Sequence, residues 1–445
     1  MISGCRSCGS EYLRSVLSLG NIPLTDSYVE ESDLSDPEPR FPLDVAFCPE
    51  CSLVQIIQTV PPEAMFSDYA YFSSFADTVV ANAQQNTDSL IAKRNLGPND
   101  LVVEIASNDG YLLKNFVGKG IPVLGIDPAE GPAGVARSEG VPTITRFFDR
   151  HLALELRKDG GADVIIANNV LAHVPDLNGF VAGIATLLKD EGVAVIEAPY
   201  IRDLIEKGEF DTIYHEHLCY FSVTALTMLF RRHGLWLNEV EHLPIHGGSL
   251  RLYVEKVQRP MNAGVFLDDE RRCGLIEFDY YRKFETRVQN IQTSLVHLLG
   301  GLKAEGCSIA AYGAAAKGTV ILNSAGVDSE TIDFVVDRNV HKQGKYLPGT
   351  RIPIRDTSVL SAEVPDYVLL LSWNFRDEVI AQQRDYLAAG GRFIVPVPYP
   401  EVISLDAHQP AHPGTSDDRP LRFSEGSLRS RGPSLAVGRR PRGGR

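Results

Sequence analysis

Short, almost continuous apolar runs alternate with helical stretches through most of this chain, and this alternation limits its fold more than any other feature. In the first half, four such runs occur, at 101–106, 122–127, 163–168 and 192–199. Apolar strands separated by helices indicate a parallel sheet that is covered on both faces. Two later segments, at 235–244 and 248–256, are expected to add antiparallel strands at one edge of that sheet.

The same pattern recurs between residues 307 and 398, which predicts a second doubly wound sheet. A long helical periodicity at 268–303 is expected to form the bridge between the two units. The expected fold class is therefore α/β. The predicted organisation is a small N-terminal domain at 1–70, a central domain at 71–256, a C-terminal Rossmann-like domain at 257–405 and a disordered tail at 406–445.

Charge and hydropathy exclude several classes of protein. The formal net charge of −14 argues against a general nucleic-acid binder. No apolar run reaches the ~18 residues that a membrane span needs, and the N-terminus lacks the pattern of a secretory signal. We therefore expect a cytoplasmic protein with no nucleic-acid or membrane partner. Any anionic ligand must then be held by local cations or helix N-termini.

Four of the seven cysteines form two C-x-x-C pairs in the N-terminal domain: Cys5 with Cys8, and Cys48 with Cys51. Each pair can present two thiolates to one ion, and two pairs complete a tetrahedral shell of four sulfurs. Such a shell leaves no open position, so the sequence predicts a structural Zn²⁺ that staples a segment with few apolar residues. Reduced cysteines without a metal are the alternative.

A polar turn follows the strand predicted at 101–106 and opens a helix. Its pattern departs from the dinucleotide motif G-x-G-x-x-G and is closer to the acidic-x-Gly-x-Gly-x-Gly turn of S-adenosylmethionine binders. Glu104 supplies the acid, Ala106 and Asn108 occupy two of the glycine places, and Gly110 occupies the third. Asp127 follows Glu104 by twenty-three residues, at the end of the next strand, where an acid can accept both ribose hydroxyls. An ordinary turn of an α/β sheet is the alternative.

Asn168, Asn169 and His173 follow the third apolar strand. Open α/β sheets hold their ligands at this end of the strands, so we expect the two asparagines to contact the cofactor and His173 to face the site. For His173, a packing or capping role is the alternative.

The densest polar cluster is Tyr214-His215-Glu216-His217. In an extended segment Tyr214 and Glu216 would face one way and the two histidines the other. A histidine of near-neutral pKa suits proton abstraction beside a carbonyl. A His-x-His metal site and a structural role are the alternatives.

Two further polar turns lie later in the chain. The turn 313–318 joins a strand to a helix, and Lys317 with the helix N-terminus is expected to hold a diphosphate; helix packing is the alternative. Arg251 follows the His-Gly-Gly-Ser turn and is expected to reach the sugar or the phosphate. Tyr69 and Tyr71 lie where the N-terminal and central domains meet. We expect Tyr69 to face the substrate and Tyr71 the catalytic groups, with core packing as the alternative.

The two cysteine pairs, EIASNDGYLL, GIDPA, NNVLAHV, YHEHLCYFS, HGGSLR and YGAAAKG occur in one order. In this the chain resembles the S-adenosylmethionine-dependent sugar C-methyltransferases, of the type that methylates C-3 of nucleotide-linked 4-keto-deoxyhexoses in deoxysugar and antibiotic biosynthesis. The resemblance covers about residues 1–403, and Ala106 departs from the glycine that the family has there.

The resemblance implies a zinc-binding N-terminal domain, a class I methyltransferase central domain and a Rossmann-like C-terminal domain. It implies that His217 is the base, with Tyr214 and Glu216 beside it and His173 in the same cleft. The expected reaction is methyl transfer to the carbon next to the ketone of a dTDP-type keto-sugar, through an enolate generated by the histidine. Another activated ketone, or a nucleotide-sugar oxidoreductase or epimerase, is the alternative; a zinc-stapled binding protein would leave the Tyr-His-Glu-His cluster unexplained.

Overall fold

The largest sheet of the molecule contains seven strands in the order β10-β11-β8-β7-β4-β5-β6. The computed structural model describes residues 4–61, 72–75 and 77–405. If the seven strands are numbered 1 to 7 in chain order, they lie side by side in the order 3-2-1-4-5-7-6. Strands 1 to 5 form a doubly wound parallel core, and strands 6 and 7 form an antiparallel hairpin at one edge. The expected class I fold is confirmed. The strands are β4 (Val102–Ile105), β5 (Val123–Ile126), β6 (Thr143–Ile144), β7 (Ala162–Asn168), β8 (Leu188–Pro199), β10 (Trp236–Leu243) and β11 (Ser249–Glu255).

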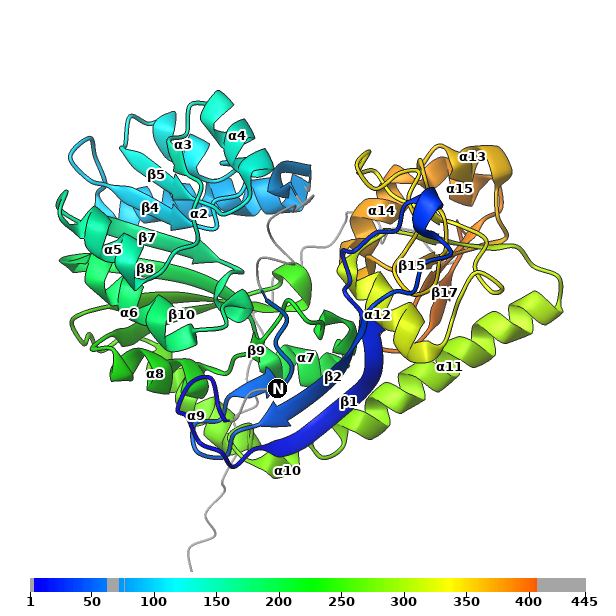
Figure 1. Ribbon diagram of the computed structural model, residues 1–445, viewed down its shortest axis with the longest axis horizontal. Helices are drawn as coiled ribbons and strands as arrows, with labels where there is room; N and C mark the ends of the chain where they lie inside the picture. The colour runs from blue at the N-terminus through cyan, green and yellow to red at the C-terminus, as the bar shows by residue number, and fades with distance from the viewer. Residues whose placement is uncertain (1–3, 62–71, 76, 406–445) are drawn as a thin grey trace, which may run out of the picture. The chain divides into compact units, whose positions relative to one another are not determined.

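Both faces of this sheet are covered by helices (Figure 1). Alternate side chains of β7 show why its sequence is apolar throughout: Val164 and Ile166 join one buried cluster, and Ile165 and Ala167 join another. The covering helices are α2 (Asp77–Arg94), α3 (Leu113–Val117), α4 (Glu130–Ser138), α5 (Arg150–Arg157), α6 (Leu177–Leu187), α7 (Ile201–Lys207) and α8 (Val223–Arg232).

A second, six-stranded sheet has the order β14-β13-β12-β15-β16-β17. Its strands are parallel except for β17, and the order within the sheet is 3-2-1-4-5-6, the Rossmann order. Its strands are β12 (Ile309–Tyr312), β13 (Val335–Val336), β14 (Ile354–Arg355), β15 (Tyr367–Leu370), β16 (Arg392–Val395) and β17 (Glu401–Ile403). Its helices are α12 (Ala316–Ala325), α13 (Val359–Glu363), α14 (Arg376–Gln382) and α15 (Arg384–Ala388).

The N-terminal segment forms a four-stranded antiparallel sheet that it does not complete by itself. Strands β1 (Arg14–Pro23), β2 (Arg40–Phe47) and β3 (Val54–Ile56) are consecutive, but the fourth strand, β9 (Cys219–Tyr220), comes from the far end of the central domain. Its apolar side chains belong to one buried cluster with those of the central sheet and of α12. The segment therefore shares a core with the rest of the chain.

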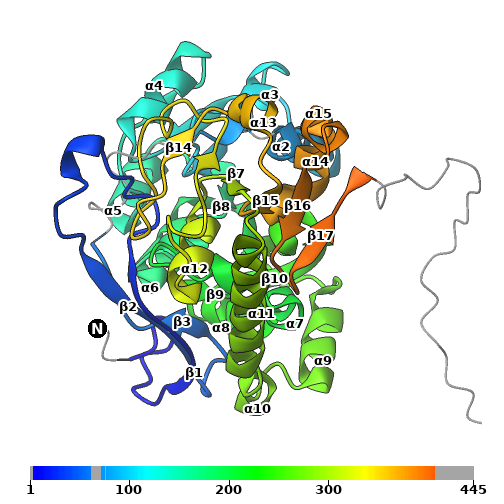
Figure 2. The same cartoon turned by 90° about the vertical axis from the view of Figure 1, so that its right-hand side faces the viewer.

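The bridge predicted as one long helix is three helices, so this expectation is wrong in detail. They are α9 (Ala263–Cys273), α10 (Phe278–Tyr281) and α11 (Phe284–Ala304). Gly274 adopts a left-handed conformation, φ +82°, and ends α9, because a left-handed residue cannot continue the helix. Figure 2 shows α11 along its whole length, facing the viewer. Within the described residues, no helix has the length and apolar character needed to cross a membrane.

Candidate active site

A cavity of about 1110 Å³ lies where the carboxyl ends of strands from both parallel sheets meet. In the seven-stranded sheet the order changes direction between β4 and β7, and in the six-stranded sheet between β12 and β15. Such switch points are where open α/β sheets bind ligands. The lining residues come from all three sheets' neighbourhoods and include Asp26, Ala106, Asn108, Asp127, Asn168, Asn169, His173, Tyr214, Glu216, His217, Lys317 and Lys342.

The turn after β4 has three left-handed residues at alternate positions: Ala106 (φ +58°), Asn108 (φ +50°) and Gly110 (φ +75°). These are the three positions predicted to correspond to glycines, so the backbone adopts the conformation that the motif requires even where the side chain is larger. Ala106 and Asn108 line the cavity. Gly110 lies behind the turn, where a β-carbon would be 3.1 Å from Ala136 and Val141.

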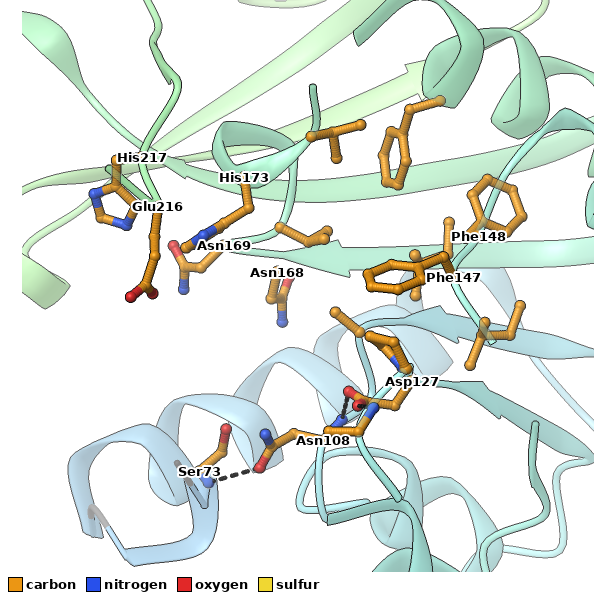
Figure 3. Close-up of a pocket in the computed structure, with 18 of the residues that line it drawn as sticks. Ser73, Asn108, Asp127, Phe147, Phe148, Asn168, Asn169, His173, Glu216 and His217 are labelled. Carbon is orange, nitrogen blue, oxygen red and sulfur yellow. Dashed lines mark hydrogen bonds between the residues drawn. The ribbon is translucent and has the colours of Figure 1, made fainter. Parts of the chain in front are cut away.

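Asp127 directly follows β5 and lines the cavity beside this turn (Figure 3). Its carboxylate accepts the backbone N–H of Asn108 at 2.8 Å and that of Ala129 at 2.9 Å. Each oxygen keeps lone pairs for a further donor, which suits a pair of ribose hydroxyls. Burial raises the pKa of Asp127, and the two N–H donors oppose that rise.

Glu104 lies under the turn, within the sheet. It is 1% exposed, and neither carboxyl oxygen has a partner among the described residues. Burial, together with the nearby Asp127, Asp109 and Glu197 carboxyl groups, raises the pKa of Glu104 well above its usual range. Glu104 is not among the residues that line the cavity.

Asn168 and Asn169 end β7 and turn their amides toward the cavity (Figure 3). The Oδ1 atoms of both are buried and lack a partner within the described part of the chain. Buried polar atoms of this kind are satisfied in nearly all proteins, so a ligand with N–H or O–H donors fits here. The ammonium group and hydroxyls of S-adenosylmethionine are such donors.

The loop after β6 also lines the cavity, and sequence reasoning missed it. Phe147 and Phe148 lie there, and Phe147 remains 43% exposed. Apolar faces at the end of a nucleoside-sized cavity suit a planar base. The two adjacent phenylalanines at 147–148, directly after a strand, were the available signal.

The Tyr-His-Glu-His cluster forms a turn and not an extended segment, so its side chains do not alternate between two faces. The His217 N–H donates to the carbonyl oxygen of Tyr214 at 2.9 Å, which closes a four-residue turn. As a result Tyr214 and His217 lie together, with ring centroids 4.0 Å apart, instead of on opposite sides. Tyr214, Glu216 and His217 all line the cavity.

The hydrogen bonds of His217 define its tautomer. Nδ1 lies 2.8 Å from the carbonyl oxygen of Thr212, which can only accept, so Nδ1 carries the hydrogen. In the neutral ring Nε2 then has the lone pair, and it accepts the hydroxyl of Tyr214 at 2.9 Å. The ring of His173 lies edge-on at 4.7 Å, and burial lowers the pKa of His173 to about 4, so His173 is neutral.

His215 points the other way. Its Nε2 lies 3.2 Å from the carbonyl oxygen of Pro42, and its ring packs edge-on against Phe41. His215 is not among the lining residues of the cavity. Within the described residues, no histidine belongs to a cluster of three or more ligands that could hold an ion, so the geometry does not favour the His-x-His metal site.

Lys317 begins α12 and lines the cavity from the side of the six-stranded sheet. Its Nζ donates to the Thr212 hydroxyl at 2.9 Å and lies 4.8 Å from the ring of Trp373. Gly318 lets α12 pack closely against Leu371, because a β-carbon at this position would be 2.8 Å from that side chain. The turn therefore serves helix packing and also presents Lys317 to the cavity.

Arg251 lies elsewhere. It is buried on β11, pairs with Glu197 at 2.7 Å and Glu241 at 3.3 Å, and does not line the cavity. The geometry thus does not bring it to a substrate as predicted, because two carboxylates and the Asn82 amide already use its donors. Tyr69 and Tyr71 lie outside the described residues.

The four predicted cysteine ligands come together. The Cys5 and Cys51 sulfurs are 3.5 Å apart, as are those of Cys8 and Cys48, and all four lie within 4.8 Å of one another. Tetrahedral Zn²⁺ with Zn–S bonds of about 2.3 Å separates its sulfurs by roughly 3.8 Å, so the cluster fits the ion. All four positions are protein sulfurs, which makes the centre structural.

Three family models match the chain in order: a zinc binding domain at 5–66, a methyltransferase domain at 79–240 and a C-methyltransferase C-terminal domain at 244–398. The C-methyltransferase NovU of Streptomyces niveus is 37% identical over 412 residues, which cover 91% of this chain and 98% of that protein. A ubiquinone biosynthesis O-methyltransferase of Burkholderia thailandensis is 29% identical over 167 residues, 34% of this chain and 70% of that protein.

Among solved structures, the magnesium protoporphyrin IX methyltransferase of Synechocystis PCC 6803 with bound SAM matches at 19% identity and a TM-score of 0.32, covering 41% of this chain and 82% of that one. The similarity to NovU extends along nearly the whole length of both chains. This chain belongs to the S-adenosylmethionine-dependent C-methyltransferases that carry an N-terminal zinc-binding domain.

Proposed function

We propose that this protein transfers a methyl group from S-adenosylmethionine to C-3, the carbon next to the ketone, of a nucleotide-linked 4-keto-deoxyhexose, as a step of deoxysugar biosynthesis. The observation that carries the proposal is the turn 214–217, which directs His217 into the cavity with its Nδ1 bonded to the Thr212 carbonyl oxygen and its Nε2 facing the Tyr214 hydroxyl. Carbon methylation needs such a base, because the acceptor carbon must first lose a proton.

His217 takes that proton at Nε2 once the Tyr214 hydroxyl, which donates to Nε2 without substrate, turns its hydrogen to the ketone oxygen. The Thr212 carbonyl holds the Nδ1 hydrogen and stabilises the imidazolium that forms when Nε2 is protonated. The electron pair left on carbon spreads onto the ketone oxygen as an enolate. Tyr214 and Glu216, in the same turn, are placed to orient the ring and to donate to that oxygen.

The donor binds at the β4, β5 and β7 ends of the cavity. Asp127 would hold the ribose, Asn168 and Asn169 the polar end, and Phe147 the base. When bound, S-adenosylmethionine supplies an electrophilic methyl carbon for in-line displacement. The chain's contribution is to hold the acceptor carbon against that methyl.

The nucleotide binds on the side of the six-stranded sheet. The N-terminus of α12 and the Lys317 ammonium face the cavity, and Lys342 lines it from the loop after β13. Two lysines and a helix N-terminus suit a diphosphate in a chain that is acidic overall.

The test is turnover and proton exchange in His217→Asn. We expect methyl transfer to a dTDP-4-keto-deoxyhexose to fall by about 10²–10⁴-fold, with donor binding by calorimetry retained. Exchange of the C-3 proton into deuterated water should fall in parallel. His297→Asn, on the exposed side of α11, is the matched control and should keep both activities. Wild-type protein that methylates a different activated ketone, and no keto-sugar in a panel, would overturn the proposed substrate.

A further inference from the structure

A carboxyl group from the N-terminal segment lies in the methyltransferase cavity. Asp26 follows β1 and lines the cavity together with Glu216 of the catalytic turn. The neighbouring Thr25 hydroxyl is 3.4 Å from a carboxyl oxygen of Glu216. Two acidic side chains that come from distant parts of the sequence thus face one another beside His217.

The hydrogen bonds around Asp26 hold its carboxyl group in place. The Tyr28 hydroxyl oxygen lies 2.8 Å from Asp26 Oδ1 and 2.7 Å from the carbonyl oxygen of Ala314. The hydroxyl has one hydrogen, which it can donate to either oxygen. Lys342 Nζ also donates to the Ala314 carbonyl oxygen at 2.9 Å, so Tyr28 is available to donate to Asp26 and to fix that carboxyl beside Glu216.

We propose that Asp26 is a positioning residue that shares protons with Glu216, so that Glu216 faces the cavity as a neutral acid able to donate a hydrogen bond to the ketone oxygen of the acceptor. The inference rests on the proposed function and deepens it. It assigns the N-terminal segment a part in the chemistry beyond holding zinc.

The surroundings of the pair favour the neutral form. Burial is the largest cause that raises the pKa of Glu216, and the charge of Asp26 and a hydrogen bond that the Glu216 carboxyl donates to Asp26 raise that pKa further. Lys342 opposes them, but its ammonium also donates to the Ala314 carbonyl at 2.9 Å. The titratable and charged groups that face the pair from the neighbouring elements are Tyr28, Lys342, Asp337 and His173.

The step balances without any further reagent. His217 Nε2 takes the proton from carbon, and the electrons of that C–H bond move onto the ketone oxygen, which accepts a hydrogen bond from Glu216. The same electrons return to carbon and form the bond to the methyl carbon, while the methyl–sulfur bond of the donor breaks and its electron pair stays on sulfur. The ketone is restored, and Glu216 keeps its proton. His217 later releases its proton to solvent. A neutral donor at the oxygen stabilises the enolate more than the ketone, which lowers the barrier.

The test is the pH profile of kcat/KM in Asp26→Asn. With a neutral amide in place of the carboxyl, the charge and hydrogen bond that raise the pKa of Glu216 are gone. The alkaline limb should then move to lower pH, with kcat/KM down about 10–100-fold at alkaline pH and within about three-fold of wild type on the acidic side. Glu216→Gln, a donor that cannot ionise, should lose this limb. Asp33→Asn, exposed in the same N-terminal segment, is the control and should leave the profile unchanged.

Infrared difference spectra of the protein without substrate give a second readout that does not depend on turnover. We expect a protonated-carboxyl band at neutral pH in the wild type that disappears in Glu216→Gln and titrates at lower pH in Asp26→Asn. An unmoved alkaline limb in an active Asp26→Asn, or a carboxyl band that neither substitution changes, would overturn the inference. Absence of keto-sugar methylation by the wild type would instead reject the proposed function, and the infrared spectra would still decide the carboxyl pair.

Discussion

Glu104 brings a carboxyl group into the seven-stranded sheet, where both oxygens are buried and lack partners among the described residues. Its pKa in the folded protein is raised above the unfolded value, chiefly by burial. The stability that it contributes is thus fully present below the unfolded pKa and is lost as pH rises toward the folded pKa. A glutamine at this position does not ionise and does not lose that stability.

We therefore expect Glu104→Gln, without methyl donor, to gain melting temperature relative to wild type as pH rises from acidic to alkaline values. The measurement is thermal unfolding across pH by calorimetry. Glu130→Gln, on the exposed first turn of α4, is the control and should track the wild type. A difference that shrinks with rising pH would show that Glu104 is ionised and paired in solution.

Ala106 holds a left-handed backbone conformation that costs an alanine about 1 kcal/mol or more and costs a glycine almost nothing. Ala106→Gly should raise the free energy of unfolding by about 0.5–1 kcal/mol, measured by denaturant titration. Ala129 lines the same cavity but has an ordinary φ of −86°. Ala129→Gly is therefore the matched control and should lower the free energy of unfolding by a similar amount.

Most strands of both parallel sheets could be predicted from the sequence, because strands buried on both faces are apolar along their whole length. Local backbone hydrogen bonds, and the pairing of segments that are far apart in the sequence, could not be predicted in this way. The turn at 214–217 depends on one backbone hydrogen bond to the Tyr214 carbonyl, which no side-chain periodicity reports. The pairing of β3 with β9 depends on a contact between segments far apart in sequence. The substrate contact predicted for Arg251 is not found for a similar reason, because its ion-pair partners Glu197 and Glu241 come from other strands.

At the scale of elements, the cysteine cluster fixes the turns that flank β1, β2 and β3. We expect one zinc per chain, and we expect Cys48→Ser to lose most of it, because structural Zn²⁺ sites contribute about 10 kcal/mol or more of apparent binding energy that depends on all ligands. The measurements are metal analysis and thermal unfolding. Cys273→Ser, at the end of α9, is the control and should retain the metal. Zinc-free wild-type protein after gentle purification would contradict the prediction.

At the scale of the whole described molecule, the cavity lies between two parallel sheets. In the proposed function, the seven-stranded sheet binds the methyl donor and the six-stranded sheet binds the nucleotide. Lys317→Ala should raise KM for the nucleotide sugar by about 10–100-fold, the loss expected for one charge-assisted hydrogen bond to a phosphate. Affinity for S-adenosylmethionine should stay unchanged, because its proposed contacts lie on the other sheet. Steady-state kinetics and calorimetry separate the two effects.

The control for Lys317 is Lys303→Ala, near the end of α11, whose ammonium pairs with Asp333 away from the cavity. It should leave both constants unaltered. Equal losses of donor and acceptor affinity in Lys317→Ala would mean that the lysine holds the two lobes together through Thr212 and does not bind phosphate.

The pairing of β3 with β9 also has a consequence for how the chain is made. Val54 and its partner Tyr220 are more than a hundred and sixty residues apart. At a synthesis rate of about 5–20 residues per second, the ribosome takes on the order of ten to thirty seconds to supply the missing strand. During that interval β3 presents an open, apolar edge, which is a template for pairing with another nascent chain. We therefore expect slower translation to lengthen the exposure of this edge, and early zinc binding by the cysteines that emerge first to hold the β2–β3 turn during that interval.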